Sequence, residues 1–203
     1  MMRPEEIEQE SMRTIRREMG QWSGTAEELP VVMRVIHATA DFDFKETLRF
    51  SGDAVGRARK ALAAGCTVVT DTGMAAAGIN KIAAARTGVE VVCRMSDPDI
   101  RKAAQERGVT RAIVSVEEAV KHTPEAIFAI GNAPTALLRL CELIDEGRAR
   151  PALVIGVPVG FVNVIESKER LVRTKVPFIA AVGRKGGSTV ACAIVNALLY
   201  GLD

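Results

Sequence analysis

The chain contains 203 residues, of which 48% are apolar, so it can fill a folded core and is too hydrophobic for an intrinsically disordered protein. Lys and Arg number 27 against 25 Asp and Glu, and the net charge of +2 gives no basic surface of the kind that marks a general nucleic-acid binder. Aromatic residues make up only 4% of the chain, which also argues against a base-stacking platform. At this length we expect one domain, residues 1–203, and no nucleic-acid partner.

The distribution of charge and cysteine indicates a cytoplasmic protein with no membrane partner. Residues 1–18 are charged throughout and include no apolar stretch, so no secretory signal is expected. The longest uncharged stretch, Pro151–Ile165, is too short to span a membrane and is interrupted by Pro158, so it is predicted to be a buried strand and turn. The cysteines lack CxxC spacing, which favours reduced structural thiols, with metal ligation as the alternative. They are Cys66, Cys93, Cys141 and Cys192.

The N-terminal quarter of the chain is predicted to be helical. Residues 5–20 place apolar side chains at helical spacing and form a first amphipathic helix. A second helix opens at Thr25–Glu28, whose Thr-x-x-Glu pattern is that of a capping box. Ser51 is predicted to cap a third helix, which Gly65 ends.

A regular alternation of strands and helices follows. The strands are short, continuous and rich in Val and Ile, as strands covered on both faces must be. They are expected at 66–70, 89–93, 125–130, 152–156 and 177–182, with helices at 74–86, 98–107, 110–122, 134–146, 161–173 and 188–199. Strands separated by helices require right-handed crossovers and a parallel sheet. The predicted fold is α/β, a three-layer α/β/α sandwich with a five-stranded parallel sheet, preceded by two helices outside the winding.

The segments that follow the strands are rich in Gly, Pro, Asn and Ser. Ligands of such sheets bind outside the carboxyl ends of the strands, and glycine turns leading into helices accept anions there. The alternative is that short turns need these residues in any case. No GxGxxG follows a strand and no GxxxxGK[ST] occurs, so no NAD or ATP is assigned and no cofactor is expected. The Arg184–Lys185 pair beside Gly186 suits carboxylates of a substrate.

Two histidines are the only candidates for an imidazole that titrates near neutrality. His122 ends a predicted helix, where a cation favours the helix dipole, and is interpreted as a cap. His37 flanks an apolar stripe, with Arg34 three residues before it and Asp41 four after, so all three are expected along one side of the helix. A half-buried imidazole beside a guanidinium has its charged form disfavoured, which suits proton donation. A histidine merely packed at the border of the core is the alternative.

Six segments, spread from residue 11 to residue 188, carry motifs that are specific in combination. They are Ser11–Glu18, Arg34–Ala38, Ala129–Leu137, Gly156–Val162, Glu166–Lys168 and Gly183–Ser188. With these motifs, among them IGNAPTAL, GVPVGFV and ESK, the chain resembles the precorrin-8X (cobalt-precorrin-8) methylmutases of cobalamin biosynthesis. The resemblance covers nearly the whole chain.

The resemblance implies a flavodoxin-like sheet, a homodimer and an isomerase that needs no cofactor or external methyl donor. The family moves a methyl group from C-11 to C-12 of a tetrapyrrole to give hydrogenobyrinic or cobyrinic acid. Its acid/base histidine corresponds to His37, and its substrate-contacting serine and arginine correspond to Ser11 and Arg34. The substrate's carboxylates account for anion-accepting turns, with Asn132, Arg184 and Lys185 as wall candidates by position only.

Two other functions remain open at this point. One is a non-catalytic carrier of corrinoid acids, against which the intact set of Ser11, Arg34 and His37 argues. The other is a flavodoxin-like redox protein, which the scarcity of aromatic residues disfavours. No motif reports whether the substrate is metal-free or already contains cobalt.

Overall fold

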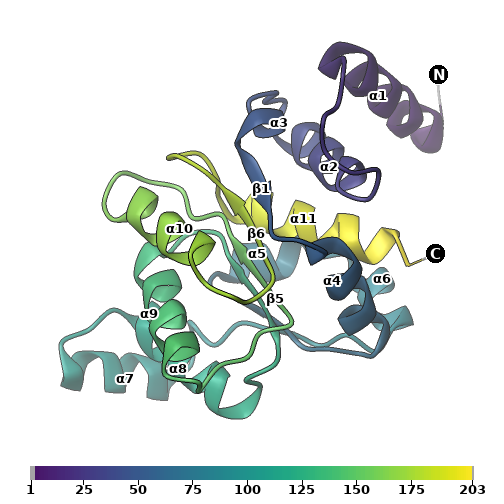
Figure 1. Ribbon diagram of the computed structural model, residues 1–203. Helices are drawn as coiled ribbons and strands as arrows, with labels where there is room; N and C mark the ends of the chain where they lie inside the picture. The colour runs from purple at the N-terminus through teal and green to yellow at the C-terminus, as the bar shows by residue number, and fades with distance from the viewer. Residues whose placement is uncertain (1–2, 203) are drawn as a thin grey trace.

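Six strands form one sheet in the computed structural model, which describes residues 3–202 (Figure 1). They are β1 (Leu48–Phe50), β2 (Val68–Thr70), β3 (Val91–Val92), β4 (Ile127–Ile130), β5 (Leu153–Gly156) and β6 (Phe178–Ala181). Their order across the sheet is β1-β6-β5-β4-β2-β3. The five strands expected from the sequence are all present and pair in parallel. Counted from β2, their order is 2-1-3-4-5, which is flavodoxin-like as expected.

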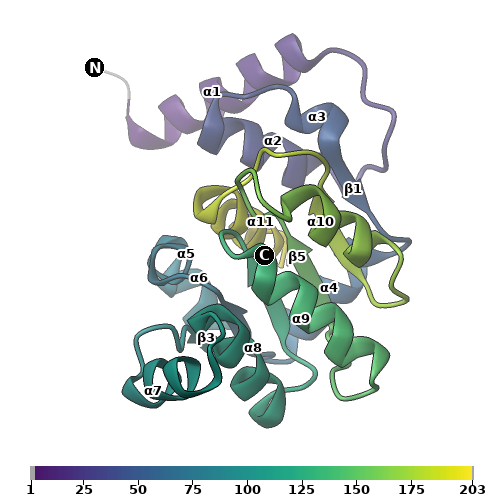
Figure 2. The same cartoon turned by 90° about the vertical axis from the view of Figure 1, so that its left-hand side faces the viewer.

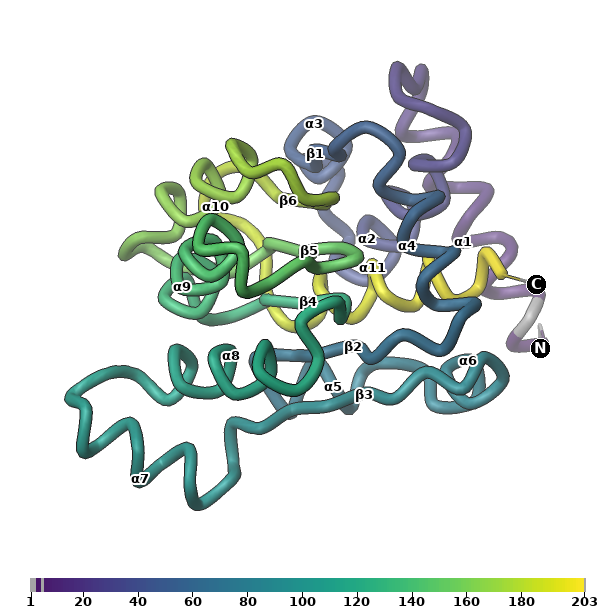
Figure 3. The backbone as a smooth tube through the Cα atoms, turned by 60° about the horizontal axis from the view of Figure 1, so that its bottom comes forward, coloured from purple at the N-terminus to yellow at the C-terminus, as the bar shows by residue number. Residues whose placement is uncertain are grey.

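Helices cover both faces of the sheet. They are α1 (Pro4–Met19), α2 (Leu29–Thr39), α3 (Phe44–Thr47), α4 (Ala54–Ala63), α5 (Gly73–Gly78), α6 (Lys81–Arg86), α7 (Pro98–Arg107), α8 (Arg111–His122), α9 (Pro134–Asp145), α10 (Val164–Val172) and α11 (Ser188–Tyr200). Helices α8, α9 and α10 lie on one side and α4 and α11 on the other (Figure 3). The three-layer α/β/α arrangement is therefore confirmed.

The side chains of the central strands alternate between two buried clusters. Ile127 and Ala129 of β4 join the cluster under α4 and α11, whereas Phe128 and Ile130 join the cluster under α8 and α9. Period-two alternation with both sets apolar is what a strand buried on two faces requires. The uninterrupted apolar runs in the sequence therefore mark the centre of the sheet.

The first two helices stand outside the winding, as expected. Helix α2 packs on α11, and α1 packs on α2, so α1 lies farthest from the sheet (Figures 1 and 2). The capping box forms: Thr25 Oγ1 accepts from the Glu28 amide at 3.2 Å, and the Glu28 carboxylate accepts from the Thr25 amide at 3.0 Å. The helix itself begins one turn later, at Leu29.

Three local predictions were wrong. Residues 48–50 form a sixth strand, antiparallel to β6, which was not predicted because a segment of three residues is too short for its alternation to be recognised in the sequence. Ser51 does not cap α4, because its hydroxyl accepts a hydrogen bond from the Phe178 amide instead. The helix expected at 74–86 is two helices, because Asn80 leaves the helical path and its side chain caps α6.

The helix expected at 161–173 begins only at Val164, after an irregular segment. In residues 3–202 no helix is both long and apolar enough to cross a membrane.

Candidate functional site

The turns at the carboxyl edge of the sheet are fastened to one another by hydrogen bonds. Thr72, after β2, shares a hydrogen bond of 2.7 Å with Ser188 at the start of α11. The Gly160 amide, after β5, donates to the Arg184 carbonyl after β6 at 3.3 Å. Segments that follow three strands, β2, β5 and β6, thus meet at one edge, as the parallel topology requires.

The switch point of the sheet, between β2 and β4, is occupied by the chain's own carboxylate. Asp71 accepts hydrogen bonds from the amides of Gly131, Asn132 and Ala133 at 2.7–2.8 Å. The side chain is buried, and this burial raises the pKa of its carboxyl group against the lowering effect of the three amides. The amides of Gly131, Asn132 and Ala133 are therefore already bound to Asp71, so an anion-accepting role of this turn would have to use other groups.

The 183–187 loop after β6 is held in place by a buried ammonium group. Lys168 on α10 is 1% exposed, and its Nζ donates to the carbonyls of Gly183 and Lys185, each at 2.8 Å. Burial lowers the pKa of Lys168 to about 8, because no counterion compensates for its lost hydration. Nothing in the sequence pattern distinguished this lysine from a surface residue, although it belongs to the ESK motif.

The same loop is pressed against the segment after β5. Gly186 has a φ of +156°, and a Cβ there would lie 2.1 Å from the Val157 carbonyl oxygen, so only glycine fits. The Gly187 amide donates to that same carbonyl at 2.9 Å. The glycine-rich sequence after β6 therefore serves a close approach of two backbones.

Lys185 joins this loop to the end of α2. Its Nζ lies 2.6 Å from a carboxylate oxygen of Asp41 and 2.6 Å from one of Asp43. The hydrogen bond from Lys185 lowers the pKa of Asp41. The prediction that Asp41 shares a helix side with His37 is wrong, because Ala40 adopts a left-handed conformation (φ 53°) and ends the helix first.

His37 and Ser11 line one groove between α1 and the α2–α3 corner. The groove has a volume of about 400 Å³, and its apolar wall includes Ile15, Ile36 and Phe42. His37 is exposed to solvent, so the expected half-burial of its ring is wrong for the chain on its own. The Ser11 hydroxyl donates to the Ile7 carbonyl at 2.8 Å, which leaves its oxygen free to accept from a ligand.

Arg34 is near His37 in the sequence but does not line that groove. Its guanidinium lies 2.8 Å from the Glu8 carboxylate of α1 and stacks over the Tyr200 ring at 5.0 Å. The structure thus brings Ser11 and His37 together and places Arg34 on the adjoining side, where three helices meet.

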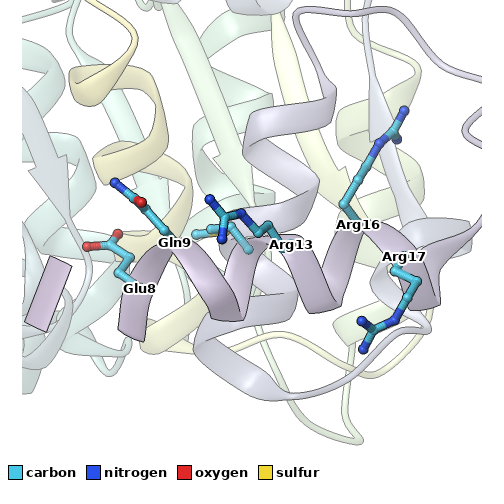
Figure 4. Close-up of a pocket in the computed structure, with 6 residues that line it drawn as sticks. Glu8, Gln9, Arg13, Arg16 and Arg17 are labelled. Atoms are coloured by element: carbon cyan, nitrogen blue, oxygen red, sulfur yellow. The ribbon is translucent and has the colours of Figure 1, made fainter. Parts of the chain in front are cut away.

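A second and larger groove, of about 740 Å³, is lined only by α1 (Figure 4). Its arginines are Arg13, Arg16 and Arg17, and the side chains of Arg16 and Arg17 point in different directions in Figure 4. Arg13 pairs with Glu10 on the same helix. No second element fixes these side chains, so this groove is a weaker candidate than the one that holds His37.

One exposed aromatic residue at the carboxyl edge was missed by sequence reasoning. Phe161, in the segment after β5, is 85% exposed. Its ring carries the guanidinium of Arg184 at 5.6 Å from the ring centroid. Arg184 and Lys185 were expected to bind carboxylates together, but Lys185 is engaged with the protein's own acids and only Arg184 is open.

Metal chemistry finds no support in residues 3–202, where no three His, Cys, Asp or Glu side chains gather in a way that could hold an ion. The four cysteines are unpaired thiols. Burial raises the pKa of the Cys141 thiol to about 12, so it is inert at neutral pH. His122 ends α8 as predicted, with its Nε2 4.0 Å from a carboxylate oxygen of Glu118.

The sequence is similar to one described family. A profile named precorrin-8X methylmutase matches residues 6–201. Cobalt-precorrin-8 methylmutase of Priestia megaterium is 47% identical, over 97% of this chain and 88% of the relative. Precorrin-8X methylmutase of Pseudomonas aeruginosa is 41% identical, over 95% of this chain and 93% of the relative.

The fold agrees with a solved structure. The precorrin-8X methylmutase of Thermus thermophilus superposes with a TM-score of 0.89 at 44% identity, and the match covers 96% of each chain.

Proposed function

Since the chain belongs to the precorrin-8X methylmutase family and is an isomerase of cobalamin biosynthesis, we propose that His37 is its general acid and base. The observation that carries this proposal is the groove shared by His37 and Ser11 beside the carboxyl edge of the sheet. The other imidazole, His122, lies at the end of α8 on the opposite face and is explained as a helix cap. An exposed imidazole in a groove can exchange its proton with a ligand and with solvent.

The reaction needs a proton but consumes none. The C-11–methyl bond of the tetrapyrrole breaks, the C-12–methyl bond forms, and the conjugated double bonds shift, so the product is an isomer of the substrate. A proton given by His37 to the conjugated macrocycle draws electron density from C-11 and eases the migration. The same imidazole takes the proton back afterwards, so no oxidant, reductant or methyl donor is required. Acid–base catalysis of this type contributes about 10²–10⁴-fold.

We assign substrate binding to Ser11 and Arg34. The hydroxyl oxygen of Ser11, a residue that lines the groove, keeps lone pairs that can accept a hydrogen bond, and the Arg34 guanidinium has donors beyond the one used by Glu8. The substrate carries many carboxylates, which a guanidinium binds through paired hydrogen bonds.

Replacement of the imidazole tests the proposal. His37→Asn is expected to leave a folded protein that binds the pigment and to lower kcat by about 10²–10⁴-fold. His122→Asn is the matched control and should keep parental turnover. Near-normal turnover of His37→Asn with binding intact would show that the protein positions the methyl shift without acid catalysis.

The metal state of the substrate is tested separately. Relatives are named for precorrin-8X and for cobalt-precorrin-8, so both forms should be incubated with the protein and followed by absorbance. Conversion of one form alone identifies the substrate. Binding of either form without conversion would instead indicate a corrinoid carrier.

We further propose that residues 1–203 are one domain that works as a cytoplasmic homodimer. The exposed apolar side chains Ile7 and Phe42 beside the His37 groove support the dimer, because a partner subunit would cover them and close the site.

A further inference from the structure

We propose that Phe161 and Arg184 form a platform that binds one face of the tetrapyrrole macrocycle and one of its peripheral carboxylates. This inference rests on the proposed function and adds to it a substrate contact outside the groove of His37. Four observations carry it: the exposure of the ring, the missing partner of the arginine, the rigidity of the backbone that bears both, and their position.

The first observation is a group of apolar side chains that are exposed to solvent rather than packed in the core. Phe161 is 85% exposed and Val162 76%, and Val159, two residues earlier, is 46% exposed. Large apolar side chains grouped at one place on a surface mark a binding site. A conjugated macrocycle offers a broad apolar face, and aromatic rings stack on such faces.

The second observation is an arginine without an acid. Arg139 and Arg170 each pair with carboxylates on the helices around them. Arg184 is exposed, its guanidinium forms no ion pair within residues 3–202, and it stacks over the Phe161 ring. A guanidinium that already stacks on an aromatic ring keeps its N–H groups for a ligand carboxylate. Ring and cation thus match the two chemical parts of the substrate, its apolar face and its acidic rim.

The third observation is that the backbone around Arg184 is fixed on both sides. Lys168 binds the carbonyls of Gly183 and Lys185, which flank Arg184, and the Gly160 amide binds the carbonyl of Arg184 itself. The last bond joins the loop of Arg184 to the segment of Phe161. A binding surface held in this way loses little conformational entropy when a ligand arrives.

The fourth observation is position. Lys185, next to Arg184, is bound to Asp41 and Asp43 directly after α2, which carries His37 at its last turn. The loop that carries Arg184 is therefore attached to the end of the helix that carries the imidazole. The proposal places one large ligand across both.

The experiment measures binding rather than turnover. Phe161→Ala and Arg184→Gln are titrated with the reaction product and followed by the pigment's absorbance. Each is expected to raise Kd about tenfold, the ring through lost stacking and the arginine through lost charge-assisted hydrogen bonds. Phe161→Tyr should keep parental affinity, because it retains the aromatic face. The matched controls are Ile82→Ala, 72% exposed on α6, and Arg173→Gln, whose side chain is 74% exposed on α10's C-terminal side.

Sedimentation at the titration concentration separates binding from assembly. Weaker binding by variants whose sedimentation mass equals that of the parent protein supports the platform, whereas Kd values equal to those of the parent overturn it. Loss of the parental mass by Phe161→Ala would also overturn it, because the ring would then be a subunit contact. The His37→Asn variant distinguishes the two proposals: if it turns over normally, the acid role fails while the binding result for Phe161 and Arg184 stands.

Discussion

Two buried charged side chains carry much of the local order at the carboxyl edge. Asp71 and Lys168 are 4% and 1% exposed, and within residues 3–202 neither pairs with a charged side chain. Each is instead surrounded by backbone groups of a turn, amides for the carboxylate and carbonyls for the ammonium. A buried charge is tolerated only where such hydrogen bonds replace its hydration. These two residues therefore fix turns rather than bind a ligand.

The burial of Lys168 makes stability depend on pH in a definite direction. The folded chain holds this proton with a pKa of about 8, against an ordinary value of 10.5. Between these values the unfolded chain binds more protons, so the free energy of unfolding rises with pH, by up to about 3 kcal/mol. Lys168→Met should lack this rise. Urea unfolding of both proteins from neutral pH to about pH 10 measures it, and parallel curves would contradict the assignment.

Arg34 gives a second test at this scale. Arg34→Ala removes the contacts with Glu8 and Tyr200, of which the Glu8 pair is partly exposed and contributes little to stability. We expect the fold to persist and the affinity for substrate and product to fall about ten- to a hundredfold. Arg173→Ala, which removes an exposed arginine paired with Glu169 next to α10, is the control. If the two variants bind substrate and product with equal affinity, Arg34 does not bind the ligand and serves only to hold the helices together.

Among the helices and strands, the sequence predicted the strands that are buried on both faces. The apolar runs at 127–130 and 153–156 identified strands because both faces of each are covered. Strand β1 was not predicted because it lies at the edge of the sheet and has only three residues. Leu48 is buried and Arg49 is exposed, and so short an alternation is not a recognisable pattern. The break between α5 and α6 at Asn80 was not predicted, because Asn80 is held by hydrogen bonds to Asn196 and Tyr200, more than a hundred residues away in the sequence.

The contact between the 183–187 loop and the α2–α3 corner can be broken by one substitution. Lys185→Met removes the bridge to Asp41 and Asp43, and because these groups are partly exposed to solvent the loss of stability should be small. KM should nevertheless rise, since the corner beside His37 loses its attachment to the sheet. Lys121→Met, which removes an exposed lysine paired with Glu118, serves as the control. Unfolding at ordinary temperature, or an unchanged KM, would count against this role.

At the scale of the whole molecule, the site could be recognised from motifs but not assembled from them. Ser11 and His37 stand apart in sequence and meet only because α1 crosses α2. Asn132 was a candidate by its position, yet its turn is closed by Asp71, a residue 61 positions earlier. Phe161 attracted no attention, since nothing in a sequence distinguishes an exposed phenylalanine from a buried one.

The proposed dimer leads to a prediction about mass. The first turn of α1 extends past the body of the molecule, and Ile7 is 52% exposed (Figure 2). Analytical ultracentrifugation should therefore give about twice the chain mass of 21.8 kDa. Ile7→Glu should shift the population toward single chains, because a charge in an apolar contact is costly. A parent protein that sediments as a single chain at micromolar concentration would refute the dimer.

The pairing of the first and last parts of the chain has a consequence for biosynthesis. Helix α2 packs on α11, and β1 pairs with β6. Elements that the ribosome makes early can therefore reach their native contacts only after the last elements have been made. Until translation is nearly complete, the apolar face of α2 that packs on α11 lacks its native partner. The nascent chain therefore exposes the apolar face of α2 during most of its synthesis, and we expect chaperones to bind the chain there.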